Sequence, residues 1–385
     1  MNRKQFFLVL LALAIVGGAG LVLLKRNHQT WAVHEAKVGD KVLPDFPFNN
    51  IAAIHVKGAV DFNVVRTNGL WRVRERNDYP ANFAMISDLL LKIKELKVVQ
   101  SDIIGPSQFP RLNLNQPGSQ TNGSTLFEFK DVHDKVVASL FLGKKHDKIQ
   151  NESEPLGMHG FFDGRYVLLP GDLHNALLVS DELAAAAPEP EFWLNRDFFK
   201  IENIRLISLI STNPDNSWEI SRENNSSPWV LANPNPGEVL DTNVVYDPGE
   251  ILAFPTFNDV MPKTSASLAS QGLDKPIVVT VLTDDLAYTL KVGRKNEDGT
   301  YPMTVAVAGN IPAQRAAAAD ERPEDTARLD AEFQNKTGEL RQKLAKVQAL
   351  ASWIYEADHW IEMVIHNRSD LLEKKTAVLD QTARQ

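Results

Sequence analysis

Residues 62–73, with the sequence FNVVRTNGLWRV, are the clearest signal of a β-hairpin in the chain. Asn68-Gly69 stands between two apolar segments, and both residues tolerate the positive φ angles of a two-residue hairpin turn. Asp163-Gly164 and Asp298-Gly299 precede further apolar runs in the same way. We therefore expect the chain beyond its N-terminus to be organised around strand hairpins.

An amphipathic helix follows the first hairpin. Apolar residues at intervals of three and four share one face of an α-helix, and here they are Phe83, Ile86, Leu90 and Ile93. Pro80 suits the first turn, where a helix needs no backbone N–H. The corresponding later segment, residues 242–253, is interrupted by Pro248-Gly249. We expect a shorter or broken helix there.

The hairpin and helix pattern occurs twice. Landmarks recur in the same order at a spacing of roughly 150 residues, which is typical of an internal duplication. The paired landmarks are Ile54 and Ile207, Trp71 and Trp229, Pro117 and Pro276, and Gly143 and Gly293. We place the first copy at residues 28–187 and the second at residues 188–315.

Residues 6–24 form an apolar run with basic residues at both edges. About 20 apolar residues match a hydrocarbon core of about 30 Å when helical. A cleaved signal peptide is the alternative, but its apolar stretch is usually only about 7–15 residues long. We therefore predict a transmembrane anchor at residues 1–27, with the protein in the cell inner membrane as a single-pass protein and its large domain extracytoplasmic.

A charged helical region is expected at residues 316–385. Its apolar residues, including Phe333, Leu344 and Ile354, keep to one stripe, while acids and bases alternate on the other face. The predicted fold is thus α+β. It consists of an N-terminal transmembrane helix, two tandem related β-hairpin/helix/β-hairpin domains and a long C-terminal amphipathic helix.

Composition excludes several classes of protein. The chain has no cysteine, which rules out disulfides, thiolate catalysis and cysteine-ligated zinc. Its net charge of −8 argues against a nucleic-acid partner. With 43% hydrophobic residues, the chain has enough apolar surface to form substantial cores.

The sequence contains no motif that specifies a chemistry. The nine histidines show no metal-binding spacing. His146 and His159 lie in a polar segment that we interpret as a solvated loop. Neither a nucleophile elbow nor a phosphate-binding loop is present. We predict no catalytic residues, no metal and no cofactor.

The densest charged patch of interest contains Arg72, Arg74 and Arg76. Alternate residues of a strand share one face, so three arginines in one strand would present a basic row to an acidic partner or an anionic glycan. A solvent-facing row paired with nearby acids is the alternative. These three arginines are the candidate partner-binding residues.

Several of these segments together resemble the family of domain of unknown function 4340. The resemblance rests on the apolar run, residues 71–80, Leu142-Gly143 and Gly272-Leu273-Asp274-Lys275-Pro276. It implies an anchored envelope protein associated with auxiliary components of gliding-motility-type ABC transporters. The family supplies no catalytic residues to carry over.

We therefore expect a non-catalytic, membrane-anchored envelope scaffold or binding protein, an accessory component of an ABC-type transport system. Its partners would be transporter subunits or a second copy of the chain. A cell-wall or glycan-binding module is the alternative, with Trp218 and Tyr301 as exposed aromatic residues. An envelope hydrolase is a lesser alternative that rests on the many carboxylates.

Overall fold

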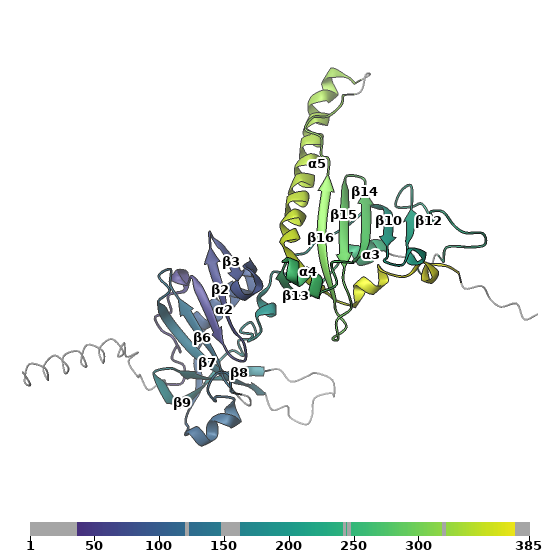
Figure 1. The fold of residues 1–385 in the computed structure, drawn as a ribbon. Helices are drawn as coiled ribbons and strands as arrows, with labels where there is room; N and C mark the ends of the chain where they lie inside the picture. The colour runs from purple at the N-terminus through teal and green to yellow at the C-terminus, as the bar shows by residue number, and fades with distance from the viewer. Residues whose placement is uncertain are drawn as a thin grey trace, which may run out of the picture. The chain divides into compact units, whose positions relative to one another are not determined.

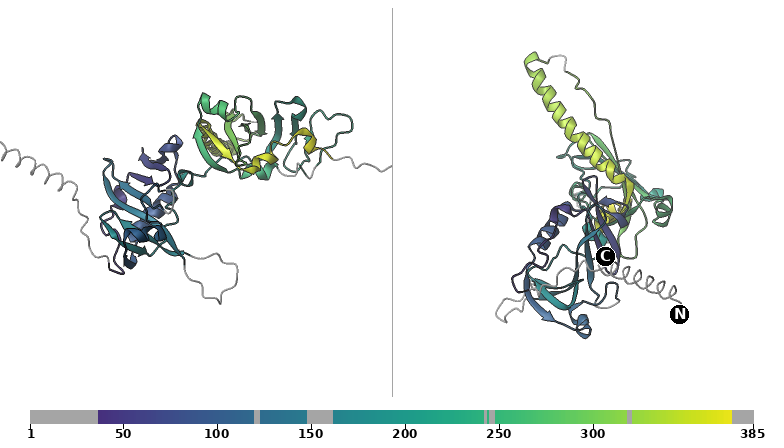
Figure 2. Two further views of the ribbon diagram at one scale, coloured as in Figure 1. Left: turned by 60° about the horizontal axis from the view of Figure 1, so that its bottom comes forward. Right: turned by 90° about the vertical axis from the view of Figure 1, so that its left-hand side faces the viewer.

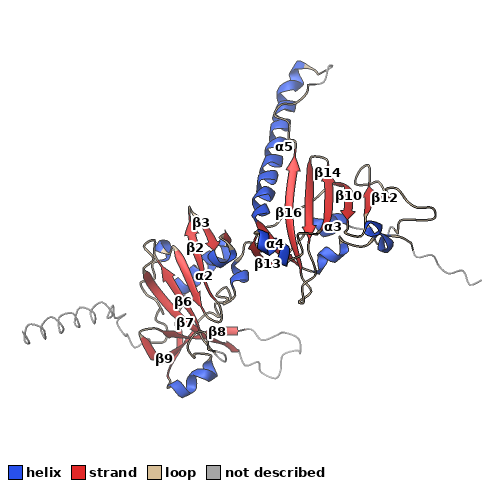
Figure 3. Cartoon of the chain, viewed as in Figure 1, coloured by secondary structure: helices blue, strands red, loops and turns tan. Residues whose placement is uncertain are grey.

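The computed structural model describes residues 37–119, 123–147, 162–241, 244, 248–317 and 321–373. These residues form two compact units. Unit 1 comprises the described residues up to Glu75 together with Pro80–Trp193, and unit 2 comprises Arg76–Tyr79 together with those from Leu194 onward. Strands dominate both units (Figure 3).

Unit 1 is built on one antiparallel sheet (Figure 1). Its strands are β1 (Ala53–Lys57), β2 (Asp61–Thr67), β3 (Leu70–Val73), β4 (Tyr79–Pro80), β5 (Val98–Ile103), β6 (Thr125–Lys130), β7 (Val136–Asp147), β8 (Phe162–Leu169) and β9 (Asp172–Val179). Among the described residues, their order across the sheet is β4-β3-β2-β1-β6-β7-β8-β9-β5. The helical elements are η1 (Phe48–Asn50), η2 (Arg74–Arg76), α2 (Phe83–Glu95), η3 (Pro106–Leu112) and η4 (Pro190–Trp193).

Local chemistry explains the first hairpin and the helix after it. Asn68 and Gly69 both have positive φ angles, 53° and 79°, so the turn between β2 and β3 has the twist that a tight hairpin needs. Helix α2 begins after Asn82, whose side chain accepts a hydrogen bond from the Met85 backbone N–H at 3.2 Å. Ile86, Leu90 and Ile93 of α2 are buried in the core of unit 1, whereas Phe83, which we expected on the same face, is 67% exposed.

Unit 2 is built on a second antiparallel sheet. Its strands are β10 (Ile204–Ile210), β11 (Trp218–Ser221), β12 (Val230–Leu231), β13 (Phe257–Pro262), β14 (Ile277–Thr283), β15 (Leu286–Val292), β16 (Tyr301–Gly309) and β17 (Trp353–Ala357). Among the described residues, their order is β12-β11-β10-β14-β15-β16-β17-β13. The helical elements are η5 (Pro214–Asn216), α3 (Pro248–Ala253), α4 (Ser265–Ser270), α5 (Pro323–Ala349), η6 (Leu350–Ser352), η7 (His359–Met363) and η8 (Arg368–Leu371).

The two sheets have the same topology. Apart from β4, the first three strands of each unit form a meander at one edge of the sheet. The fourth strand lies at the opposite edge, and the last four strands lie between them. A helix precedes the far-edge strand in each unit, α2 before β5 and α3 before β13. The main difference is the last hairpin. Strands β8 and β9 meet in a tight turn, whereas α5 is inserted between β16 and β17 and packs along β16 (Figure 2).

The expected α+β class is wrong, because the described chain is mostly β-structure in two large antiparallel sheets with few helices. The expected helical region at residues 316–385 is helical mainly in α5. Residues 353–357 form the interior strand β17 instead, which pairs with β13 and β16. Sheet pairing overrides the helical spacing there, because an interior strand satisfies its backbone on both sides.

The predicted transmembrane segment, residues 1–27, lies outside the described residues. Among those that are described, no helix combines the length and the apolar character needed to span a membrane. The long helix α5 is too rich in charge for that role, since it carries acids and bases on most of its turns.

Candidate functional site

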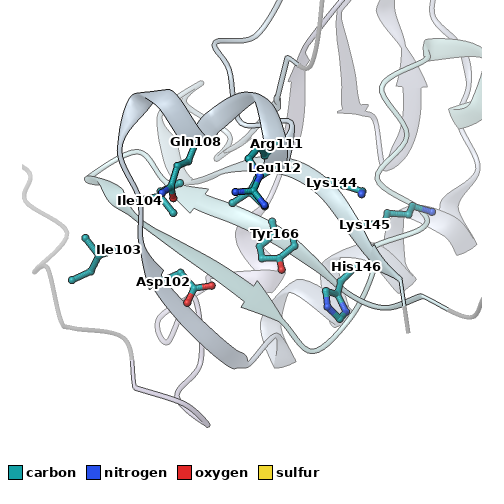
Figure 4. A pocket seen from close by; sticks show the side chains of 10 residues that line it. All are labelled: Asp102, Ile103, Ile104, Gln108, Arg111, Leu112, Lys144, Lys145, His146 and Tyr166. Atoms are coloured by element: carbon teal, nitrogen blue, oxygen red, sulfur yellow. The ribbon is translucent and has the colours of Figure 1, made fainter. Parts of the chain in front are cut away.

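An open pocket with a volume of about 540 Å³ lies in unit 1, between the edge strand β5, the 3₁₀-helix η3 and strands β7 and β8 (Figure 4). Cations outnumber acids among the side chains that line it. The lining residues are Asp102, Ile103, Ile104, Gln108, Arg111, Leu112, Lys144, Lys145, His146 and Tyr166.

A β-bulge brings consecutive residues of β7 to this pocket. The register between β7 and β8 shifts between Leu142 and Lys145, so β7 contains one extra residue opposite β8. Bulges change the direction of the side chains that follow them. Lys144, Lys145 and His146 therefore all reach the pocket, although regular alternation would send neighbouring residues to opposite faces.

The floor of the pocket is apolar. Ile104, Leu114, Leu168 and Ala176 form a buried cluster, against which Tyr166 packs. Gly143 permits this arrangement, because a Cβ at that position would collide with the Leu112 carbonyl oxygen and the Leu114 side chain. The glycine lets the end of η3 lie directly on strand β7.

Two of the basic side chains that line the pocket lie beside acids. Lys145 Nζ lies 3.1 Å from Glu182 Oε2, and His146 Nδ1 lies 2.7 Å from Asp163 Oδ1. Unit 2 has a similar pair, in which Lys295 Nζ lies 2.6 Å from Glu362 Oε1. Lys145 and Lys295 each stand two residues after the corresponding glycine, Gly143 or Gly293.

Arg111 and Lys144 are the cations of the pocket that are available to a ligand. Both side chains are exposed, and no acidic side chain in the described part of the chain lies within ion-pair distance of either. Figure 4 shows Arg111 on η3, Tyr166 on β8 and Lys144 on the neighbouring strand β7. The site can therefore offer two charge-assisted donors and one hydroxyl to an anionic group.

A further cation, Arg165, lies next to strand β7 without lining the pocket. Arg165 Nε donates to the Gly143 carbonyl oxygen at 2.9 Å. Burial lowers the pKa of Arg165 to about 10, and nearby Glu182 opposes this effect. Arg165 thus remains charged at neutral pH and adds positive potential to this side of unit 1.

In the described part of the chain, no group of three or more His, Asp or Glu side chains gathers as a metal site would require. His146, which we expected in a solvated loop, belongs to strand β7. His159 lies outside the described residues.

The three predicted partner-binding arginines do not share one strand. Arg72 is half-buried in β3, whereas Arg74 and Arg76 lie in the following 3₁₀-helix η2. Arg76 Nε makes an ion pair with Asp259 Oδ1 at 2.6 Å, with both side chains about four-fifths buried. The basic row that strand alternation would have produced is therefore absent from this described segment.

The aromatic residues expected to bind glycans are also placed differently. Trp218 is only 6% exposed and donates from its indole Nε1 to the His366 carbonyl oxygen at 2.7 Å. Tyr301 is half-buried, and its hydroxyl donates to Glu362 Oε1 at 3.0 Å. Trp218 therefore supports the core of unit 2 and is not a stacking platform.

Sequence reasoning missed the pocket. The signal that could have indicated it is the basic run Lys144-Lys145-His146, which directly follows the apolar run and Gly143 within strand β7. Arg111 has no comparable signal, because only the fold of η3 brings it to β7.

Comparison with family models matches residues 71–253 to a domain of unknown function, DUF4340. The matched range begins in β3 of unit 1 and ends with α3 of unit 2. No curated protein and no solved structure matches the chain. The family resemblance expected from the sequence motifs is confirmed over residues 71–253, which match the DUF4340 family model.

Proposed function

We propose that this chain is a non-catalytic binding component of an envelope complex, an accessory subunit of an ABC-type transport system. We place it at the inner membrane with both units on the extracytoplasmic side. In this proposal, the pocket of unit 1 receives an anionic group of the partner. Membrane location and transporter association come from the family resemblance, and the mode of binding comes from the pocket.

The observation that carries the proposal is the pair of exposed cations, Arg111 and Lys144, beside an apolar floor. An anion gains most from donors that need not leave other partners. Lys145 and His146 are already engaged, by Glu182 and Asp163. Lys145 and His146 thus hold the β7 side of the pocket in place, and in this proposal Arg111 and Lys144 bind the anion.

Crosslinking in cells tests this proposal. The full-length tagged protein is crosslinked, purified from membranes and examined for an ATPase and a multi-span permease. The double variant Arg111→Glu/Lys144→Glu should lose this association. The matched control is Lys275→Glu/Lys291→Glu, which reverses two exposed cations in unit 2 and should retain it. Recovery of wall material alone, or an unchanged result for the first variant, would contradict the proposal.

The His146–Asp163 pair gives the hydrolase alternative a specific candidate, because a carboxylate that orients an imidazole is a common arrangement for a general base. None of the pocket-lining side chains described in the structure is Ser, Thr or Cys, so such an enzyme would have to activate water. Ester hydrolysis by the full-length protein that disappears in His146→Ala would replace the binding proposal with this one.

A further inference from the structure

The edge strands β5 and β13 hold corresponding positions in the two sheets, and their registers agree in detail. Val98 pairs with Val179, the last residue of β9, and Phe257 pairs with Ala357, the last residue of β17. Each edge strand then contains a one-residue bulge. Beyond the bulge, Ile103 of β5 corresponds to Pro262 of β13.

The edge of β13 is protected. Pro262 has no backbone N–H and cannot donate to an added strand. The segment Arg76–Tyr79, which belongs to unit 2, also packs against this strand. Arg76 reaches Asp259, and the Tyr79 ring lies 5.8 Å from that of Phe257. Natural sheets commonly protect their edges in these two ways, with proline and with covering segments.

The edge of β5 is covered only at its beginning in the described structure. Gly39 donates to the Val98 carbonyl oxygen at 2.8 Å, and Val98 donates to the Asp40 carbonyl oxygen at 2.9 Å. Farther along, Ile104 donates inward to the His174 carbonyl oxygen at 2.8 Å. Since inward and outward groups alternate in an antiparallel pair, the backbone groups of Ile103 and Ser101 point outward. No backbone group among the described residues pairs with them from that side.

Apolar side chains accompany this open backbone. Ile103 is 86% exposed and Val99 is 46% exposed. In Figure 4, Ile103 lies at the outer end of the pocket, apart from the other lining side chains. An exposed apolar edge strand invites pairing with another chain. The edge also continues into the pocket, because Asp102, Ile103 and Ile104 line it.

We propose that the edge of β5, from Val99 to Ile103, receives an extended acidic segment of a partner protein as an added strand. The backbone of the segment pairs with Ser101 and Ile103, and one of its carboxylates enters the pocket between Arg111 and Lys144. This inference rests on the proposed binding function and names its partner. A peptide is favoured over an anionic glycan because only a peptide backbone can pair with the outward N–H and C=O groups of β5.

The test uses the full-length protein and an alternating Glu-Val peptide of ten residues, with a Lys-Val peptide as the matched control. Fluorescence anisotropy should detect binding of the acidic peptide only. Ile103→Pro removes an outward N–H, as Pro262 does in unit 2, and should weaken binding by about tenfold or more. Ile103→Asp, which leaves the backbone intact, should weaken it through charge repulsion. Both variants should keep the circular dichroism spectrum of the wild-type protein.

Hydrogen exchange supplies a second measurement. The amides of Ser101 and Ile103 should become protected when the acidic peptide binds, because they then donate to its carbonyl groups. Peptide binding without this protection, or unchanged binding by both Ile103 variants, would overturn the inference.

The outcomes also separate this inference from the proposed function. If inorganic phosphate or an anionic oligosaccharide binds in an Arg111- and Lys144-dependent manner and the peptide does not, the added strand is wrong and the anion pocket stands. If none of these probes binds, both fail. If the protein self-associates and Ile103→Pro abolishes this association, the occupant of the β5 edge is a second copy of the chain. The proposal of an acidic partner segment would then be wrong.

Discussion

Gly143 and Gly293 end corresponding stretches of the two units and allow the same close approach. At Gly143 a Cβ would collide with the Leu112 carbonyl oxygen, and at Gly293 with that of Gln271. In unit 1, the end of η3 thus lies directly on strand β7. In unit 2, the residue that follows α4 lies directly on the residue that follows strand β15. The requirement is for the missing side chain and not for an unusual φ angle, because neither glycine has a positive φ.

Replacement of Gly143 by alanine should therefore destabilise unit 1, by about 1–3 kcal/mol, since backbone atoms must shift to accommodate the methyl group. Thermal unfolding of the full-length protein measures this change. The control is Gly338→Ala in helix α5, where nothing lies within 4 Å of a new Cβ. That variant should stabilise the helix by up to about 1 kcal/mol. Equal midpoints for the two variants would contradict the close approach.

At the scale of elements, the end of the described chain is held to an earlier loop by one ion pair. Arg368 Nη2 lies 2.6 Å from Glu238 Oε2, and the two side chains are 16% and 18% exposed. Leu372 forms an isolated bridge with Leu240 beside it. Hydrogen bonds from Arg368 and then Asn235 hold the pKa of Glu238 at about 2, below its ordinary value of 4.5.

This lowered pKa predicts a pH dependence. The stabilisation that Glu238 provides is fully present above its unfolded pKa, and it is lost as the pH falls from about 5 through 2. Glu238→Gln should lower the thermal midpoint at pH 7, and the gap to the wild-type protein should narrow toward pH 2. Glu339→Gln, at an exposed position of α5, is the control and should leave the midpoint unchanged. A gap that is constant between pH 7 and pH 2 would be inconsistent with the shifted pKa.

At the scale of the whole molecule, the described residues form two copies of one sheet topology, and the second copy is complete only with strand β17. Strand β17 pairs with β13 on one side and β16 on the other. Its Ile354, Tyr355 and Ala357 are fully buried. Without β17, the edge strand β13 would lose its only sheet partner among the described strands.

A chain that ends at Ala349 should therefore lose the calorimetric unfolding transition of unit 2 and keep that of unit 1. A chain that ends at Glu373 retains β17 and should show both transitions. If the shorter chain keeps the unit 2 transition, residues 316–385 form a separate region, as the helical pattern alone suggested.

Local chemistry by itself determined the β2–β3 hairpin, most of the apolar face of α2 and the apolar strand segments that precede Gly143 and Gly293. In each case, residues close in sequence carry the information, as a turn pair, a spacing of three and four, or a glycine after an apolar run. The DUF4340 resemblance rests on the same turn and packing residues, so it too was accessible without coordinates.

The tertiary structure alone decided the mostly β class, the strand β17 and the pocket. Residues 353–357 continue the helical stripe of α5 in sequence, but pairing with β13 and β16 makes them a strand. Arg111 and Lys144 line the same pocket only because η3 packs beside the bulge of β7. The physical reason is the same in both cases: long-range sheet pairing satisfies backbone groups and buries side chains from distant segments, and no local pattern encodes which distant segment will supply the partner.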